Sequence, residues 1–225
     1  MNIPAADYAR MLQALVETAQ VTTRDGVQLG VNAGCEQAVQ MIRALAVANS
    51  KAMVIGNGGS AAIASHMVND LNKAVGIRAM GFNDFSLITA LANDEGYARA
   101  YEACVQQWAQ ADDLLIAISS SGRSENMLRA ADAALAVGAR VLTLTGFNDD
   151  NPLRAMGDLN IHIAAEHYGL VELGHSILAH YLTDAAAAAA ARVNIVIQES
   201  VHDITFPAAS AGHRRSRLRR SRASA

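Results

Sequence analysis

Two glycine- and serine-rich loops carry the residues of this chain that are best suited to hold an anion. The first lies in Val54-Ile-Gly-Asn-Gly-Gly-Ser60, between an apolar run and an amphipathic segment without a helix breaker. That order predicts a strand, a tight turn and a helix N-terminus, whose outward-facing backbone N–H groups favour a phosphate. The second loop, Ser119–Ser124, places four serines around Gly122, although a serine-rich turn that only caps a helix would look the same. Two such loops, each after a strand, predict a phosphosugar site.

Imidazole and carboxylate groups supply a second kind of chemistry. His66 and Asp70 are spaced i,i+4, so they share one helix face as two metal ligands, an acid–base pair or a surface contact. Glu172 and His180 lie on a later predicted helix and would complete a set of two nitrogen and two oxygen donors, which suits zinc or a similar divalent ion. Eight helical residues rise about 12 Å. Glu172 and His180 therefore reach one ion only if Glu172 begins the helix irregularly or a neighbouring subunit contributes.

Two further polar positions have less specific patterns. Asn93 and Asp94 follow an apolar stretch, where they could contact sugar hydroxyls or form a turn. His175 lies off the His180 face of the same predicted helix, which indicates a packing histidine or a second site.

The elements that position these residues alternate along the chain. Residues 1–50 show helical spacing and predict two helices with a polar break near Thr22–Gly34, on the core or in an oligomer interface. Residues 51–198 alternate strand and helix, which predicts an α/β fold with a three-layer, doubly wound parallel sheet of the flavodoxin-like type and an N-terminal helical extension. Strands are expected at 52–55, 79–82, 114–118, 140–144 and 159–163, and helices at 60–75, 86–92, 97–108, 125–137 and 171–191. In such sheets ligands lie beyond the carboxyl ends of the strands, where both loops fall.

Composition limits the class of protein. Of 225 residues 52% are apolar and only 4% aromatic, which is enough for one large core built from small aliphatic side chains. No apolar run approaches the roughly 20 residues of a membrane span, and the N-terminus does not resemble a secretory signal. Two cysteines without a disulfide or metal pattern indicate a reducing cytoplasm.

The end of the chain is strongly basic. Six of the 18 lysines and arginines lie in the last dozen residues, and a net charge of −3 therefore leaves the remainder near −9. A solvated, disordered tail over residues 199–225 is expected, with at most a weak role in binding nucleic acid. Before it, residues 193–197 could form a short apolar strand or an interface segment.

Taken together, the motifs resemble the bacterial sedoheptulose 7-phosphate isomerases of the sugar isomerase (SIS) domain superfamily. The resemblance covers roughly residues 5–190 and rests on Gly56-Asn-Gly-Gly-Ser60, His66, Asp70, Asn93-Asp94, Ile118-Ser-Ser-Ser-Gly-Arg-Ser124, Leu142-Thr-Leu-Thr-Gly146, Glu172 and His180.

The resemblance implies a SIS-type fold, a homotetramer with active sites at subunit interfaces, one zinc or similar ion per subunit and no nucleotide cofactor. It implies that Asp70 and His180 are the acid–base pair and that His66, Asp70, Glu172 and His180 are the metal ligands. The residues that it places at the phosphosugar are Asn57, Gly58, Gly59, Ser60, Asn93, Asp94, Ser119, Ser120, Ser121, Ser124 and Glu172.

This chain departs from the family pattern at several positions. The family usually has Glu where this chain has Asp70, and Gln where it has Glu172. It usually has Asn in place of Arg123 and Asp in place of Ile63, and the family's Arg-Ile-Gln-Glu signature before the last helix is absent from this chain. These changes leave open a different phosphosugar, a stronger metal site or a lost activity.

The expected function is a cytoplasmic aldose–ketose isomerase of sedoheptulose 7-phosphate, which forms D-glycero-D-manno-heptose 7-phosphate through an enediol(ate) and serves lipopolysaccharide heptose synthesis. Two alternatives remain. One is a non-catalytic SIS regulator that binds phosphosugars, of the type that associates with the replication initiator and lacks the metal ligands. The other is an isomerase of a different sugar phosphate.

Overall fold

Seven strands form one mixed sheet in the computed structural model, which describes residues 3–203. Their order is β2-β1-β7-β6-β5-β3-β4. The strands from β3 onward are all parallel and span Lys51–Gly56 (β3), Arg78–Gly81 (β4), Leu114–Ser119 (β5), Arg140–Gly146 (β6) and Leu159–Ile163 (β7). This parallel part has the strand order of the flavodoxin-like doubly wound sheet, which confirms the predicted fold class.

The first two strands were not expected from the sequence. The predicted polar break near Thr22–Gly34 overlaps β1 (Gln20–Thr23) and contains β2 (Gln28–Leu29), and β1 pairs antiparallel with both β2 and β7. Val21 is fully buried, and a side chain at Gly34 would lie 2.3 Å from it. The Asp-Gly turn at Gly26, with φ of 79°, is a hairpin signal. A strand of four residues, paired with a strand of only two residues and with the distant β7, shows too little periodicity to be recognised.

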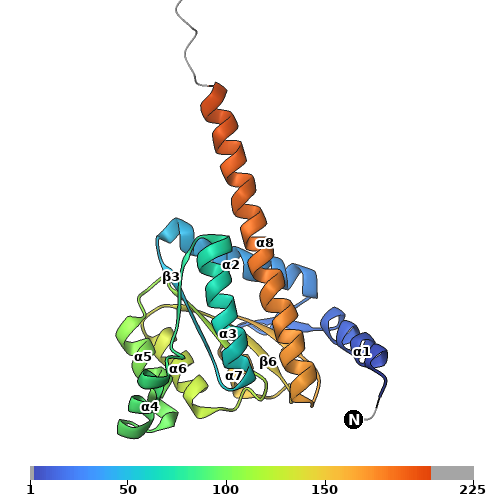
Figure 1. Ribbon diagram of the computed structural model, residues 1–225, viewed down its shortest axis with the longest axis vertical. Helices are drawn as coiled ribbons and strands as arrows, with labels where there is room; N and C mark the ends of the chain where they lie inside the picture. The colour runs from blue at the N-terminus through green and yellow to red at the C-terminus, as the bar shows by residue number, and fades with distance from the viewer. Residues whose placement is uncertain (1–2, 204–225) are drawn as a thin grey trace, which may run out of the picture. The chain divides into compact units, whose positions relative to one another are not determined.

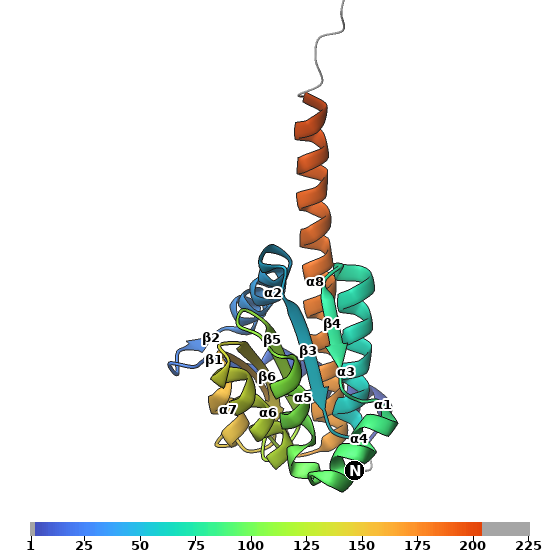
Figure 2. The same cartoon turned by 90° about the vertical axis from the view of Figure 1, so that its left-hand side faces the viewer.

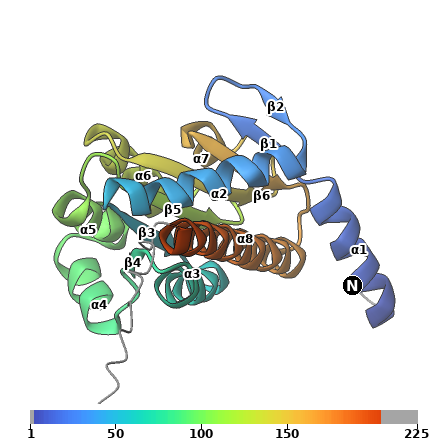
Figure 3. The same cartoon turned by 90° about the horizontal axis from the view of Figure 1, so that it is seen from above.

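Helices cover both faces of the sheet (Figures 1 and 3). The first face carries α2, α3 and α8, and the second carries α5, α6 and α7. The helices span Ala5–Glu17 (α1), Val31–Ala48 (α2), Gly59–Asp70 (α3), Phe85–Asp94 (α4), Ala100–Trp108 (α5), Glu125–Ala136 (α6), Pro152–Met156 (α7) and Tyr168–Asp203 (α8). A π-helical turn, Leu71–Val75, follows α3, and a 3₁₀ turn, Tyr97–Arg99, precedes α5. All five helices predicted in the body are present, and only the short α7 is additional.

The core divides into two layers because the strand side chains alternate between the two faces. On β3, Ala52 and Val54 face α2, α3 and α8, whereas Met53 and Ile55 face α5 and α6. This burial on both faces explains why β3 and β5 are continuous apolar runs. Figure 2 shows β3 and β4 beside α3.

The last helix extends beyond the predicted end of the domain. Residues 1–191 form one compact unit, whereas α8 continues to Asp203, so that residues 193–197 are helical and not a strand. Residues 204–225 of the predicted basic tail lie outside the described residues. Among the described helices, none is both long and apolar enough to span a bilayer.

Candidate functional site

The two glycine- and serine-rich loops meet at the point where the strand order reverses. β3 and β5 are adjacent and parallel, with Gly56 opposite Ile118 near their carboxyl ends. The first loop leaves β3 and the second leaves β5, and they lead into α3 and α6, which lie on opposite faces of the sheet. Such a switch point opens a crevice beyond the strand ends, where open α/β sheets bind their ligands.

A cavity of about 240 Å³, which we call the anion cavity, lies between these loops. It is lined by Asn57, Gly58, Gly59, Ser60, Ser119, Ser120, Ser121, Ser124, Tyr168 and Glu172. The structure therefore brings together nine of the eleven residues that the sequence placed at the phosphosugar. The α3 N-terminus borders this cavity, where its free N–H groups favour an anion.

The second loop, Ser119–Ser124, which we call the serine loop, keeps one hydroxyl without a protein partner among the described residues. Gly122 N–H donates to Ser119 Oγ over 3.1 Å, and Arg123 N–H donates to Ser121 Oγ over 3.3 Å. Ser120 is only 4% exposed, lines the cavity, and its Oγ has no hydrogen-bond partner among the described residues. A buried polar atom without a partner is costly, so this hydroxyl points to a polar ligand in the cavity.

Arg123 does not supply the positive charge of this cavity. Its guanidinium forms an ion pair of 2.5 Å with Asp150, and the residue is absent from the cavity lining. Neutral hydroxyl and N–H groups are therefore the principal donors to a ligand.

Glu172 lies at the anion cavity. A Cβ atom built on Gly59 would lie 2.4 Å from Glu172 Oε2, so the carboxylate lies directly against the first residue of α3. Within the chain, Glu172 does not join the predicted metal ligands, because it lies two turns of α8 before His180. Its assignment as a ligand stays a prediction that needs a contribution from another subunit.

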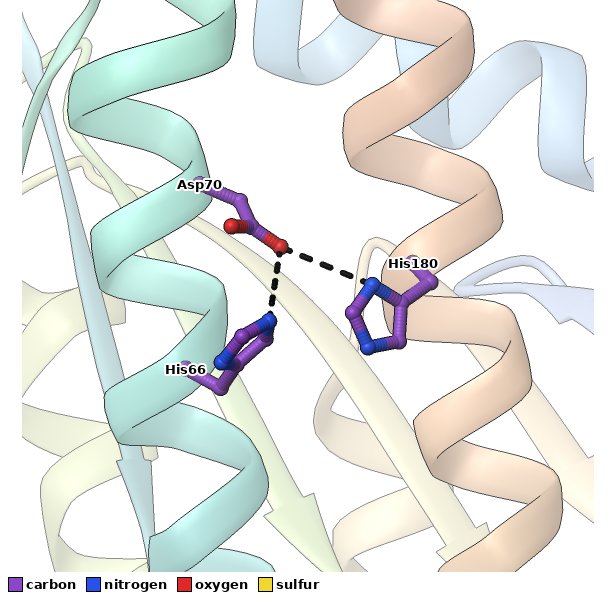
Figure 4. Close-up of side chains that lie close together, drawn as sticks. All are labelled: His66, Asp70 and His180. Atoms are coloured by element: carbon purple, nitrogen blue, oxygen red, sulfur yellow. Dashed lines mark ion pairs between the residues drawn. The ribbon is translucent and has the colours of Figure 1, made fainter.

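His66, Asp70 and His180 form a cluster between α3 and α8 (Figure 4). Asp70 Oδ2 lies 3.3 Å from His66 Nε2 and 3.6 Å from His180 Nδ1, and the two rings are 4.8 Å apart. Both histidines are about half exposed, whereas Asp70 is 21% exposed at the end of α3, where the π-helical turn begins.

The cluster borders a second cavity, of about 230 Å³, and it suits a metal ion. The cavity is lined by Ala62, Ile63, His66, Met67, Asp70, Ser176, Ala179 and His180. One donor atom from each of the three clustered residues lies within 4.8 Å of the others. Two imidazoles and a carboxylate beside an open cavity are the donor set of a catalytic zinc site that keeps a position for substrate.

Asn93 and Asp94 are not gathered into either cavity. They end α4, where Asn93 Nδ2 donates to Asp94 Oδ1 over 2.8 Å, and both are exposed. Their assignment to the phosphosugar therefore remains a prediction.

Sequence reasoning missed three polar side chains of the site. Tyr168 lines the anion cavity and packs edge-on against Phe147, and Asn126 and Tyr97 hydrogen-bond to Asn57. An Asn two residues after the loop serine Ser124 was the available signal for Asn126. Nothing in the local pattern marks the two tyrosines.

His175 is a packing histidine. It is fully buried, and its Nε2–H donates to the Thr145 carbonyl over 2.9 Å. Burial lowers the pKa of His175 to about 4, and burial likewise lowers the pKa of His162, on β7, to about 4. Both imidazoles are therefore neutral at physiological pH and lie outside the two cavities.

The comparisons with known proteins agree with this geometry. The SIS domain family matches residues 8–146. A phosphoheptose isomerase from Helicobacter pylori is 32% identical over 140 residues, which cover 60% of this chain and 72% of the relative. One from Edwardsiella ictaluri is 32% identical over 142 residues, which cover 61% and 72%. The structure of phosphoheptose isomerase from Neisseria gonorrhoeae superposes with a TM-score of 0.70 and 26% identity over 81% of this chain and 94% of that one. The chain therefore belongs to the phosphoheptose isomerase family of SIS-domain proteins.

Proposed function

We propose that this protein interconverts sedoheptulose 7-phosphate and D-glycero-D-manno-heptose 7-phosphate as an aldose–ketose isomerase. The relatives named phosphoheptose isomerase support this reaction, and so does one feature of the site. The same two helices, α3 and α8, line both the anion cavity and the cavity beside the histidine cluster.

The separation of the two cavities suits a seven-carbon sugar phosphate. Gly59 borders the first cavity, and His66 borders the second, seven residues farther along α3. Seven helical residues rise about 10 Å. An extended heptose phosphate has eight bonds from phosphorus to C1, which span about 10 Å at about 1.2 Å per bond, as in an extended backbone. A phosphate in the first cavity therefore puts C1 and C2 at the cluster.

The phosphate is held by neutral donors. The N–H groups at the start of α3 and the hydroxyls of the serine loop surround the first cavity, including the unpartnered Ser120 Oγ. Such a site binds a dianion without an arginine or lysine and so permits release of the product.

The isomerisation takes place at the cluster. His66, Asp70 and His180 would hold the zinc or similar divalent ion, which polarises the substrate carbonyl when bound. Through the carboxylate oxygen and the ring nitrogen that would not hold the ion, Asp70 and His180 would carry the proton from C1 of the ketose to C2 of the aldose, with an enediol(ate) between the two sugars. The short reach of aspartate makes this geometry depend on the positions of α3 and α8, from which the three side chains project toward one another in Figure 4.

A homotetramer with sites at subunit interfaces is part of the proposal. α1 has no buried residue, and α8 exposes Leu173, Ile177 and Tyr181 at i, i+4 and i+8. These apolar surfaces support burial against other copies, and such copies could bring Asn93, Asp94 or Glu172 to a neighbouring cluster. Two buried free cysteines support a reducing compartment such as the cytoplasm.

Incubation with sedoheptulose 7-phosphate in D₂O, followed by NMR, tests the reaction. We expect the aldose product to appear with deuterium at C2, because the proton that the base takes from C1 exchanges with the solvent before a proton is added to C2. His180→Asn should abolish turnover, whereas His167→Asn, at an exposed histidine outside both cavities, should not. Turnover of another ketose phosphate but not of this one would refute the substrate, and binding of phosphosugars without turnover of any would favour a regulator.

A further inference from the structure

Asn57 joins the two loops through a pair of reciprocal hydrogen bonds. Its Nδ2 donates to Asn126 Oδ1 over 2.9 Å, and Asn126 Nδ2 donates to Asn57 Oδ1 over 2.9 Å. Asn57 belongs to the loop after β3, whereas Asn126 lies in the first turn of α6, directly after the serine loop. The pair therefore connects the two sides of the anion cavity across 69 residues of sequence.

A third hydrogen bond sets the orientation of the Asn57 amide. Tyr97 Oη donates to Asn57 Oδ1 over 2.7 Å, so both acceptor positions of that oxygen are occupied. One N–H of Asn57 Nδ2 is bonded to Asn126, and the other has no partner among the described residues. Since Asn57 lines the cavity, this second N–H is a donor available to a ligand there.

Asn126 itself does not line the cavity. Its side chain is almost fully buried, at 3% exposed, and its amide makes both of its protein hydrogen bonds to Asn57. A buried amide that reaches the ligand only through another amide affects binding by fixing that amide in place.

We propose that Asn126 is a positioning residue that ties the two anion-binding loops together and aims an N–H of Asn57 at the phosphate group of the ligand, with Tyr97 as its helper. The inference rests on the proposed function insofar as the ligand carries a phosphate. Loss of Asn126 would free the Asn57 amide to rotate and let the two loops separate, which weakens binding at the phosphate end and leaves the histidine cluster unchanged.

Calorimetric titration of the full chain with inorganic phosphate, and with sedoheptulose 7-phosphate, tests this role. We expect Asn126→Ala to raise the Kd for phosphate about tenfold, which is a difference of about 1.4 kcal/mol. Tyr97→Phe, which leaves the amide pair in place, should raise it about threefold. Gln106→Ala removes an exposed amide that bonds only to Glu102 and should leave the Kd unchanged.

Asn126→Asp separates a positioning role from a purely structural one. A protonated carboxyl group both donates and accepts, as the amide does, whereas the carboxylate cannot donate to Asn57 Oδ1. The fold-loss in phosphate affinity relative to wild type should therefore shrink as the pH falls toward about 4, near the ordinary pKa of aspartate. A loss that is independent of pH would contradict the proposed hydrogen bond.

The outcomes distinguish this inference from the proposed reaction. If wild type binds phosphate but does not convert the heptulose phosphate, the reaction is wrong and the positioning role stands. If Asn126→Ala and Tyr97→Phe bind phosphate as wild type does, the positioning role is wrong. Should Asn126→Ala not fold, as seen by circular dichroism, the pH dependence of Asn126→Asp decides the question, because Tyr97→Phe leaves the amide pair in place.

Discussion

The serine loop depends on a glycine whose replacement should be unusually costly. Gly122 has φ of 59°, and a Cβ atom there would lie 1.9 Å from Asn151 Oδ1 and 2.9 Å from its Cβ. Gly26 has φ of 79° but no atom within 4 Å of a Cβ, so Gly26→Ala is a matched control that has the backbone strain without the collision.

The expected cost follows from the bonds of Asn151. An alanine at positive φ costs about 1 kcal/mol, and that is the whole penalty for Gly26→Ala. In Gly122→Ala the Asn151 side chain must also leave its place, where it caps α7 at Arg154 N–H and donates to Asn148 O over 2.7 Å. The cap and this hydrogen bond contribute about 1 kcal/mol each. Gly122→Ala should therefore lower the free energy of unfolding by about 3 kcal/mol, against about 1 kcal/mol for the control.

Urea unfolding followed by circular dichroism measures both variants, and calorimetry measures their affinity for phosphate. We expect Gly122→Ala to lose phosphate binding as well as stability, because Gly122 N–H donates to Ser119 Oγ within the loop. Gly26→Ala should bind phosphate normally. Equal stability of the two alanine variants would refute the collision, and normal phosphate binding by Gly122→Ala would refute the role of the loop.

Three other perturbations test the site and its surroundings. Glu172→Gln should lower the Kd for phosphate about fivefold in calorimetry, because it removes a negative charge from the anion cavity whose repulsion of phosphate is on the order of 1 kcal/mol. An unchanged Kd would mean that this carboxylate moves away when the ligand binds. His66→Ala should lose the bound divalent ion, measured by mass spectrometry of the purified protein, whereas His167→Ala should keep it; equal metal content would contradict the cluster as the site. The free energy of unfolding should fall as the pH drops from about 6.5 to about 4. In this range His162 and His175 become protonated in the unfolded chain but stay neutral in the folded one, which lowers the free energy of unfolding by up to about 3 kcal/mol for each histidine. His175→Gln should flatten this dependence in urea titrations at several pH values, and an unaltered slope would show that His175 does not cause it.

Features with a local cause were predictable from the sequence. The continuous apolar runs of β3 and β5 reflect burial on both sheet faces. The glycines and serines of the two loops reflect a tight turn and a helix start. The i,i+4 spacing of His66 and Asp70 placed them together because one helix carries both, and the structure has them 3.3 Å apart.

Features that depend on contacts between distant segments were not predictable in this way. The β1–β2 hairpin is short, and its main partner is β7, near the other end of the compact unit. The reciprocal amides of Asn57 and Asn126 meet only because β3 and β5 are neighbours in the sheet.

The assignment of α8 divides in the same way. Composition and spacing determined that this segment is a helix bearing a carboxylate and an imidazole eight residues apart. Only the packing of α8 along α3 decided that Glu172 meets Gly59 while His180 meets Asp70, because the helical rise separates the two side chains by about 12 Å. Spacing along a chain defines which residues share a helix face, whereas their partners are set by the neighbouring element on which that face is buried.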